Sequence, residues 1–270
     1  MFKKLIWQKL KNYIKEPFYL FYQSRLNRKA KLWKLPQHIG IIMDGNRRFA
    51  RSSGLSKIID GHERGANKLR EVLNWCLDLK IPVMTVWSFS MDNFERSYDE
   101  VEEILELIER KTNEVREDPD VHKHKIRVRY IGLIEMLPAS LQKAIRHTEE
   151  VTAKYNQYVL NIAVAYGGRE EITGAFKAYF KDQINKGISP QSIVEGLDAN
   201  QIDGYLYTSG LPEPDLIIRT SGEVRMSGFL MWQSLYSEYY FCDSVWPAFR
   251  KIDFLRALRS YDERQRRYGK

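Results

Sequence analysis

The chain has 270 residues, of which 43% are apolar and 13% aromatic, and its formal net charge at pH 7 is +8. This length and apolar content suit one large folded domain better than two small ones. No apolar run reaches the length of a membrane span, and no signal-peptide core is present, so a membrane-spanning protein is not expected. The two cysteines, Cys76 and Cys242, have no disulfide or zinc spacing, which favours a reducing, cytoplasmic setting.

The positive charge is concentrated at the start of the chain. Residues 1–36 contain ten basic residues and one acid, a net charge of +9, which leaves −1 for the rest. This distribution argues against a basic nucleic-acid-binding body and predicts a basic arm, residues 1–35, ahead of a nearly neutral domain, residues 36–270.

The arm has the pattern of an amphipathic helix. Its apolar residues recur at helical spacing, and most of its lysines fall on the other side; the apolar set is Phe2, Ile6, Leu10, Tyr13 and Ile14. Such a helix is expected to touch a membrane surface through residues 1–33. Packing of the arm on its own domain or on a partner is an equally good interpretation of the same pattern.

The rest of the chain alternates strand and helix patterns. Apolar runs bounded by turn signals predict strands at 38–44, 83–89, 125–132, 159–166, 215–220 and 239–242. Helical patterns occupy 61–80, 97–118, 139–154, 168–186, part of 190–207, and 253–268. This alternation predicts an α/β fold with a mostly parallel sheet covered on both faces, and functional residues at the carboxyl ends of its strands.

One polar cluster at such a strand end is the turn from Asp44 to Arg48. Gly45 permits a tight turn, and the backbone amides that follow, with the guanidinium groups of Arg47 and Arg48, can hold phosphate oxygens. Asp44 can contribute one carboxylate to Mg²⁺. By itself the same run is an ordinary Asp-Gly-Asn turn with surface arginines.

Three further clusters carry polar groups of the same kind. His62 lies in a Gly-His-Glu-Arg-Gly run at a helix start, and it could relay a proton or simply cap the helix. Residues 88–96 interleave hydroxyls and Arg96 with aromatic residues, which suits a substrate with an apolar body and a charged head. Residues 219–227 hold two arginines and several hydroxyls, a second anion site, and Glu238 could complete a metal site with Asp44. Two anion sites and one metal predict two phosphorylated substrates.

The order and spacing of these blocks resemble the cis-prenyltransferase family of undecaprenyl and dehydrodolichyl diphosphate synthases. The resemblance covers about residues 36–269 and includes 38–48, 88–96, 161–169, 219–238 and the Val-Trp-Pro at 245–247. It implies a six-stranded, mostly parallel sheet with surrounding helices and a hydrophobic tunnel, built as a homodimer. It also implies a Mg²⁺-dependent enzyme that condenses isopentenyl diphosphate with an allylic prenyl diphosphate to give a Z-polyprenyl diphosphate.

The resemblance also implies roles for individual residues. Asp44 and Glu238 would hold Mg²⁺, with Glu238 acting across the dimer. Residues matching the catalytic positions are Asp44, Asn46, His62 and Ser90. Residues matching the substrate-binding positions are Gly45, Arg47, Arg48, Phe89, Asn93, Arg96, Arg219, Arg225, Ser227, Arg267 and Gly269.

Some positions depart from the family pattern. Arg47 and Phe49 stand where many bacterial members have glycine and tryptophan, a pattern nearer the eukaryotic and archaeal branch. Ile58 occupies the usual place of a phosphate-binding arginine, whose role would pass to Lys57 or Arg51. The alternatives are a prenyltransferase acting on another acceptor, such as a glycerol-linked prenyl chain, and a non-catalytic scaffold subunit.

Overall fold

The structure is a computed structural model that describes residue 19 and residues 21–265. The amphipathic pattern of residues 1–18 and the predicted substrate-binding residues Arg267 and Gly269 lie outside these residues. Part of the arm is described: residues 21–30 are helical, and Leu26 and Ala30 are buried in the main core. Arg259 donates a hydrogen bond to the Tyr22 hydroxyl at 3.1 Å, so this part of the arm packs against the last helix of the domain.

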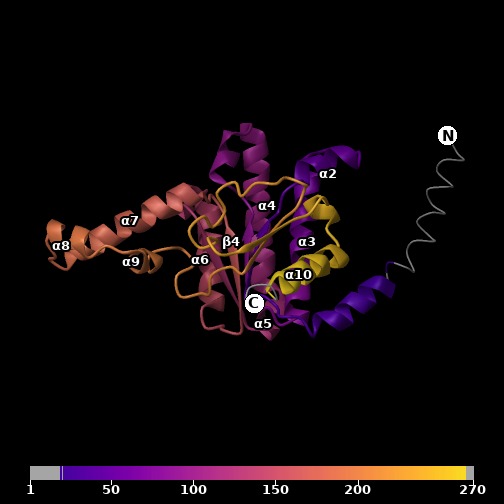
Figure 1. The fold of residues 1–270 in the computed structure, drawn as a ribbon. Helices are drawn as coiled ribbons and strands as arrows, with labels where there is room; N and C mark the ends of the chain where they lie inside the picture. The colour runs from indigo at the N-terminus through magenta and orange to yellow at the C-terminus, as the bar shows by residue number, and fades with distance from the viewer. Residues whose placement is uncertain (1–18, 20, 266–270) are drawn as a thin grey trace, which may run out of the picture.

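Six strands form one fully parallel sheet in the order β3-β4-β2-β1-β5-β6 (Figure 1). The prediction of six strands and a mostly parallel sheet is therefore confirmed. The strands are β1 (His38–Ile42), β2 (Val83–Trp87), β3 (Ile126–Ile131), β4 (Tyr158–Ala163), β5 (Leu216–Arg219) and β6 (Glu238–Phe241).

The longer helices lie within a few residues of the predicted places, whereas the short helix at 119–123 was not predicted. The longer ones are α3 (Ile59–Asp78), α4 (Tyr98–Glu117), α6 (Ala139–Thr152), α7 (Gly168–Asn185) and α10 (Lys251–Gln265). The shorter ones are α2 (Asn46–Ser52), α5 (Pro119–Lys123), α8 (Pro190–Glu195) and α9 (Ala199–Asp203), and short 3₁₀ turns occupy η1 (Met91–Glu95), η2 (Ile134–Met136) and η3 (Trp246–Ala248). No helix among the described residues is long and apolar enough to cross a membrane.

The main core lies on one face of the sheet. Ile39 and Ile41 of β1 point into it, and it takes buried residues from α3, α4, α6 and α10. The other face has a smaller cluster that includes Ile217, Phe229 and Leu230. The expected helical cover is thus found on one face, whereas Phe229 and Leu230 of the β5–β6 loop pack on the other. Helices α7, α8 and α9 lead away from the sheet on the side opposite α3 and α10 (Figure 1).

A buried carboxylate ties the β5–β6 loop to the domain. Glu171, in the first turn of α7, accepts hydrogen bonds from the Tyr166 hydroxyl at 2.5 Å, the Tyr207 backbone N–H at 2.9 Å and the Gln233 side chain at 2.7 Å. The Tyr166 oxygen accepts from the Leu230 N–H at 3.1 Å. Burial raises the pKa of Glu171. The network fixes a loop in which several residues adopt left-handed backbone conformations.

Candidate active site

The turn after β1 is built around a glycine. Gly45 has φ of +104°, a left-handed conformation that glycine adopts without strain, and a Cβ here would meet Val245. The Asp44 carbonyl accepts hydrogen bonds from the Trp246 N–H at 2.9 Å and the Thr220 hydroxyl at 2.8 Å. The turn is therefore held by two distant segments, and α2 begins directly after it.

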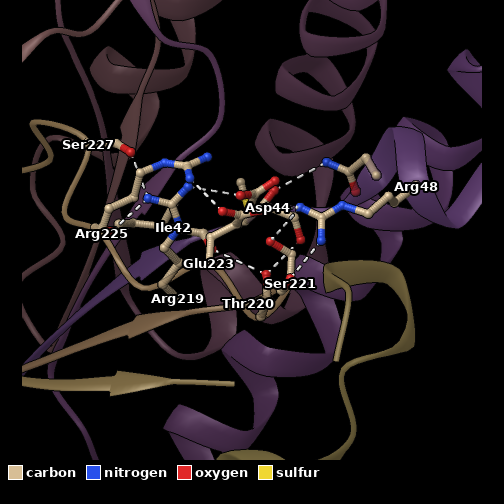
Figure 2. A network of polar contacts seen from close by, with 11 residues as sticks. Ile42, Asp44, Arg48, Arg219, Thr220, Ser221, Glu223, Arg225 and Ser227 are labelled. Atoms are coloured by element: carbon tan, nitrogen blue, oxygen red, sulfur yellow. Dashed lines mark hydrogen bonds and ion pairs between the residues drawn. The ribbon is translucent and has the colours of Figure 1, made fainter. Parts of the chain in front are cut away.

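Arg219, the last residue of β5, connects this turn to the second anion cluster (Figure 2). Its guanidinium donates to Asp44 Oδ2 at 2.9 Å, and to the Arg225 carbonyl and the Ser227 hydroxyl at 2.7 Å each. The Arg219 side chain is only 5% exposed, whereas that of Asp44 is 30% exposed. Arg219 is thus a fixed, buried positive charge beneath an accessible carboxylate.

Arg48 reaches the same cluster from the other side (Figure 2). It donates to the Ser221 carbonyl at 2.7 Å and pairs with Glu223 at 3.0 Å. Glu223 also pairs with Arg225, so this half-buried glutamate holds two arginines near one another. An anion of higher charge entering here would compete with Glu223 for both guanidinium groups.

A polar cavity of about 510 Å³ opens at the carboxyl edge of the sheet. Its lining includes six arginines and only two aspartates, so the cavity is strongly positive and suited to multiply charged anions. Every described site residue predicted from sequence, except Glu238, lines it: Asp44, Gly45, Asn46, Arg47, Arg48, His62, Phe89, Ser90, Asn93, Arg96, Arg219, Arg225 and Ser227.

Glu100 of α4 orders one side of the polar cavity. Its carboxylate pairs with Arg96 at 2.9 Å and with Arg47 at 3.4 Å, and its side chain is 15% exposed. Sequence reasoning missed Glu100 because it lies in a helix with many surface glutamates. It also missed Trp87, because a tryptophan in a strand is normally interpreted as a core residue. Trp87 lines the cavity and stacks on Phe229, with 5.3 Å between the ring centroids.

An apolar cavity of about 490 Å³ lies between α3, α4 and the sheet. Leu69, Leu107, Ile108 and Ile162 are among its lining residues. The two cavities share four lining residues, Met43, Asn46, His62 and Ser88. A charged compartment therefore meets an apolar one at Asn46 and His62.

Both residues at this junction have unused hydrogen-bonding atoms. Asn46 Oδ1 and His62 Nε2 are buried without a hydrogen-bond partner among the described residues. Burial, and then the nearby Arg96, lower the pKa of His62 from 6.5 to about 4, so its imidazole is neutral near pH 7. Gly65 provides the space for Asn46, since a Cβ there would overlap Asn46 Oδ1.

The structure does not bring Glu238 to Asp44 within one chain. Glu238 is the first residue of β6 and pairs with Leu216, whereas Arg219, next to Asp44, pairs with Phe241. Three residues of strand place Glu238 about 10 Å back toward the amino edge. There it accepts a hydrogen bond from Arg264 at 2.5 Å. A metal site of Asp44 and Glu238 from the same chain is therefore wrong, because in a parallel sheet the two ends of a strand lie at opposite edges.

Of Ile58 and the two residues expected to replace the usual arginine at its position, one lines the polar cavity. Ile58 directly precedes α3, and neither it nor the exposed Lys57 lines the polar cavity. Arg51, in the last turn of α2, does line it. Of the two expected replacements, Arg51 is the one positioned to contact an anion.

Comparison with known proteins agrees with this geometry. The sequence profile of the undecaprenyl diphosphate synthase family of prenyltransferases matches residues 42–269. An isoprenyl transferase of Thermus thermophilus is 50% identical over 257 residues, which cover 95% of this chain and 97% of the relative. A tritrans,polycis-undecaprenyl-diphosphate synthase (geranylgeranyl-diphosphate specific) of Methanocaldococcus jannaschii is 50% identical over 252 residues, 92% of this chain and 88% of the relative.

A solved structure shares the fold. Lavandulyl diphosphate synthase from Lavandula x intermedia, in complex with dimethylallyl diphosphate, superimposes with a TM-score of 0.76 at 32% identity, over 84% of this chain and 95% of that one. The chain belongs to the cis-prenyltransferase family, and its activity is that of a polyprenyl diphosphate synthase. Bacterial and archaeal relatives match at the same identity, so overall identity does not favour either branch.

Proposed function

We propose that the polar cavity binds two diphosphates and that the apolar cavity receives the prenyl chain. The observation that carries this proposal is the junction at Asn46 and His62, where the two cavities meet. The allylic diphosphate lies on the turn with Arg47 and Arg48, and its chain enters the apolar cavity. Isopentenyl diphosphate lies against Arg219, Arg225 and Ser227.

The chain's own residues supply positioning and charge stabilisation. The arginines offset the negative charge that develops on the departing allylic diphosphate, and the fixed Arg219 orients the attacking substrate. Asn46, His62 and Ser90 assist removal of the proton that leaves the new isoprenyl unit. Negative diphosphates beside His62 raise its pKa from the low value of the free site, which makes the imidazole a better proton acceptor when both substrates are bound.

The site fits Mg²⁺ of the kind held by one carboxylate and substrate phosphates. Among the described residues no three acidic, histidine or cysteine side chains converge, so a site made of protein ligands alone is not formed there. Among the described residues, Asp44 bonds Arg219 through Oδ2, and its Oδ1 is available to a cation. Asp44 would hold the ion, and the bound ion would neutralise diphosphate charge.

We also propose a homodimer in which Glu238 acts on the partner's site. The β5–β6 loop exposes large apolar residues, with Val224, Leu235 and Tyr236 each at least 73% exposed, and apolar side chains of this size are typical of protein interfaces. Mixing inactive Asp44→Ala and Glu238→Ala chains tests this arrangement. Mixed dimers would contain one intact site, so about a quarter of the wild-type activity is expected to return. Absence of any recovery would refute a site shared between subunits.

The catalytic assignment is tested with purified protein and Mg²⁺. Labelled isopentenyl diphosphate should be incorporated into farnesyl or geranylgeranyl diphosphate, and Asp44→Ala should abolish incorporation. A scaffold subunit would give no product with any short allylic primer. Incorporation only with a glycerol-linked prenyl chain would identify the alternative acceptor.

Peripheral membrane contact through residues 1–33 is a separate proposal, supported by the +9 charge and amphipathic pattern of this end. Co-flotation with anionic vesicles should be lost when residues 1–18 are deleted, a truncation that retains the packed helix at 21–30. Unchanged flotation would show that the arm does not bind membranes.

A further inference from the structure

Glu100 lies in the first turn of α4 and connects two segments that follow different strands. Its carboxylate pairs with Arg96, in the segment after β2, at 2.9 Å. It also pairs with Arg47, in the first turn of α2 after β1, at 3.4 Å. Both contacts are made by the same carboxylate oxygen, Oε1. Glu100 thus holds together two guanidinium groups whose like charges repel one another.

The contacts with Glu100 occupy few of the arginine nitrogens. Glu100 contacts Arg47 through Nε and Arg96 through Nη1. In the described part of the chain, both terminal nitrogens of Arg47 and Nη2 of Arg96 have no protein partner. Arg47 and Arg96 line the polar cavity, whereas Glu100 does not. The arginines therefore face a bound anion with free donors, and the carboxylate acts on it only through them.

Glu223 also bridges two arginines of the polar cavity, but it is more exposed. The Glu223 side chain is 31% exposed, and those of its partners Arg48 and Arg225 are 52% and 61% exposed. The Glu100 side chain is 15% exposed and that of Arg96 is 24% exposed. Exposed ion pairs are weak, so an entering diphosphate can displace Glu223 from its arginines. Glu100 is better shielded and keeps its contacts when the anion binds.

Removal of the Glu100 charge has two opposite effects on anion binding. Loss of a negative charge beside the site favours a diphosphate by itself. Loss of the shared partner frees two arginine side chains, which must be ordered again when the diphosphate binds. We propose that the second effect prevails, and that Glu100 is a positioning residue that holds Arg47 and Arg96 ready for the allylic diphosphate. This inference rests on the proposed function, because it requires the allylic diphosphate to contact these arginines.

The sign of the change in affinity tests the proposal. Calorimetric titration with farnesyl thiodiphosphate, an analogue that resists loss of its diphosphate, and Mg²⁺ should give a Kd about 5- to 100-fold higher in Glu100→Gln, since two side chains lose their order. The KM for isopentenyl diphosphate should not change. Glu103→Gln, at an exposed position one turn later in α4, removes the same charge and should leave the Kd unchanged. A lower or unchanged Kd in Glu100→Gln would overturn the proposal.

Glu223→Gln provides a contrast within the same cavity. It removes the same charge from a carboxylate that competes with the diphosphate for Arg48, so it should lower the Kd for the analogue. An equal rise in Kd in Glu223→Gln and Glu100→Gln would show a general loss of structure in the site, and the positioning role of Glu100 would be overturned.

Variants of the arginines separate failure of this inference from failure of the proposed function. Arg96→Met should itself raise the Kd for the analogue, and Glu100→Gln should have a smaller further effect in Arg96→Met than in the wild type. An undiminished effect would overturn positioning through Arg96. A raised Kd in Arg96→Met with no rise in Glu100→Gln would overturn the inference alone. An unchanged Kd in both Arg96→Met and Arg47→Met would overturn the proposed place of the allylic diphosphate, and the inference with it.

Discussion

Substitution of Gly65 by alanine should lower kcat strongly while lowering the stability of the fold only slightly. The added methyl group would overlap Asn46 Oδ1 and lie 3.0 Å from Trp246, whereas non-bonded carbon atoms prefer about 3.5–4.0 Å. Asn46 must then move by about 1 Å, and a misplacement of that size costs about 100-fold in rate. We therefore expect kcat to fall about 100-fold, equivalent to about 2.7 kcal/mol of activation free energy.

The same substitution should affect stability much less. Alanine is favoured over glycine in a helix by about 1 kcal/mol, while overpacking costs about 1–3 kcal/mol. A net loss of at most about 2 kcal/mol corresponds to a fall in Tm below about 8 °C. Gly174→Ala in α7 is the control, because its methyl group would meet nothing within 4 Å. An unchanged kcat in Gly65→Ala, or in Asn46→Ala, would refute a role for Asn46 in the reaction.

Three other predictions concern acid stability, a buried carboxylate and the replaced arginine. Burial holds the pKa of His38 at about 4, below its ordinary value of 6.5. The free energy of unfolding should therefore be fully retained above pH 6.5 and fall by up to about 1.4 kcal/mol per pH unit toward pH 4. Urea unfolding at pH 7 and at pH 5 should show a smaller loss of this free energy in His38→Gln than in the wild type. Glu171 accepts hydrogen bonds from three donors, so Glu171→Gln turns an amide N–H toward one of them and should lower the free energy of unfolding by about 1–3 kcal/mol. Glu170→Gln, at the exposed neighbouring position, is the control, and equal Tm values for the two variants would contradict this prediction. Arg51→Ala should raise the KM for the allylic diphosphate and Lys57→Ala should not, and the reverse order would show that Lys57 replaced the missing arginine.

The elements of the fold could be predicted because their signals are local. Strands β1 and β5 are short apolar runs, and helices α3 and α4 have amphipathic periodicity, so both kinds of element were found within a few residues. The cover of the second sheet face was not predictable in the same way. Phe229 and Leu230 come from a loop whose conformation depends on Glu171 and Tyr166, and periodicity carries no information about such contacts.

The positions of site residues were predictable where the residues directly follow a strand in the sequence. They were not predictable where they depend on the register between strands that are distant in the sequence. Residues after β1, β2 and β5 meet in the polar cavity because parallel strands end at one edge. Glu238 was placed beside Asp44 because both are carboxylates near predicted strands, whereas Glu238 begins β6 and so lies at the edge of the sheet opposite the end of β1. The counter-charge at Glu100 has no motif of its own, and only the folded position of α4 reveals it.

The sharing of Asn46 and His62 by a charged and an apolar compartment has a consequence for inhibition. A small anion occupies only the polar cavity, while a hydrocarbon occupies only the apolar cavity and leaves the six arginines of the polar cavity without an anionic ligand. A molecule with an acidic head, a short neutral hinge at the junction and a branched apolar tail would engage both at once. Once one half of such a molecule is bound, the other half binds intramolecularly. The affinity of the whole molecule should therefore exceed the affinity of either half alone.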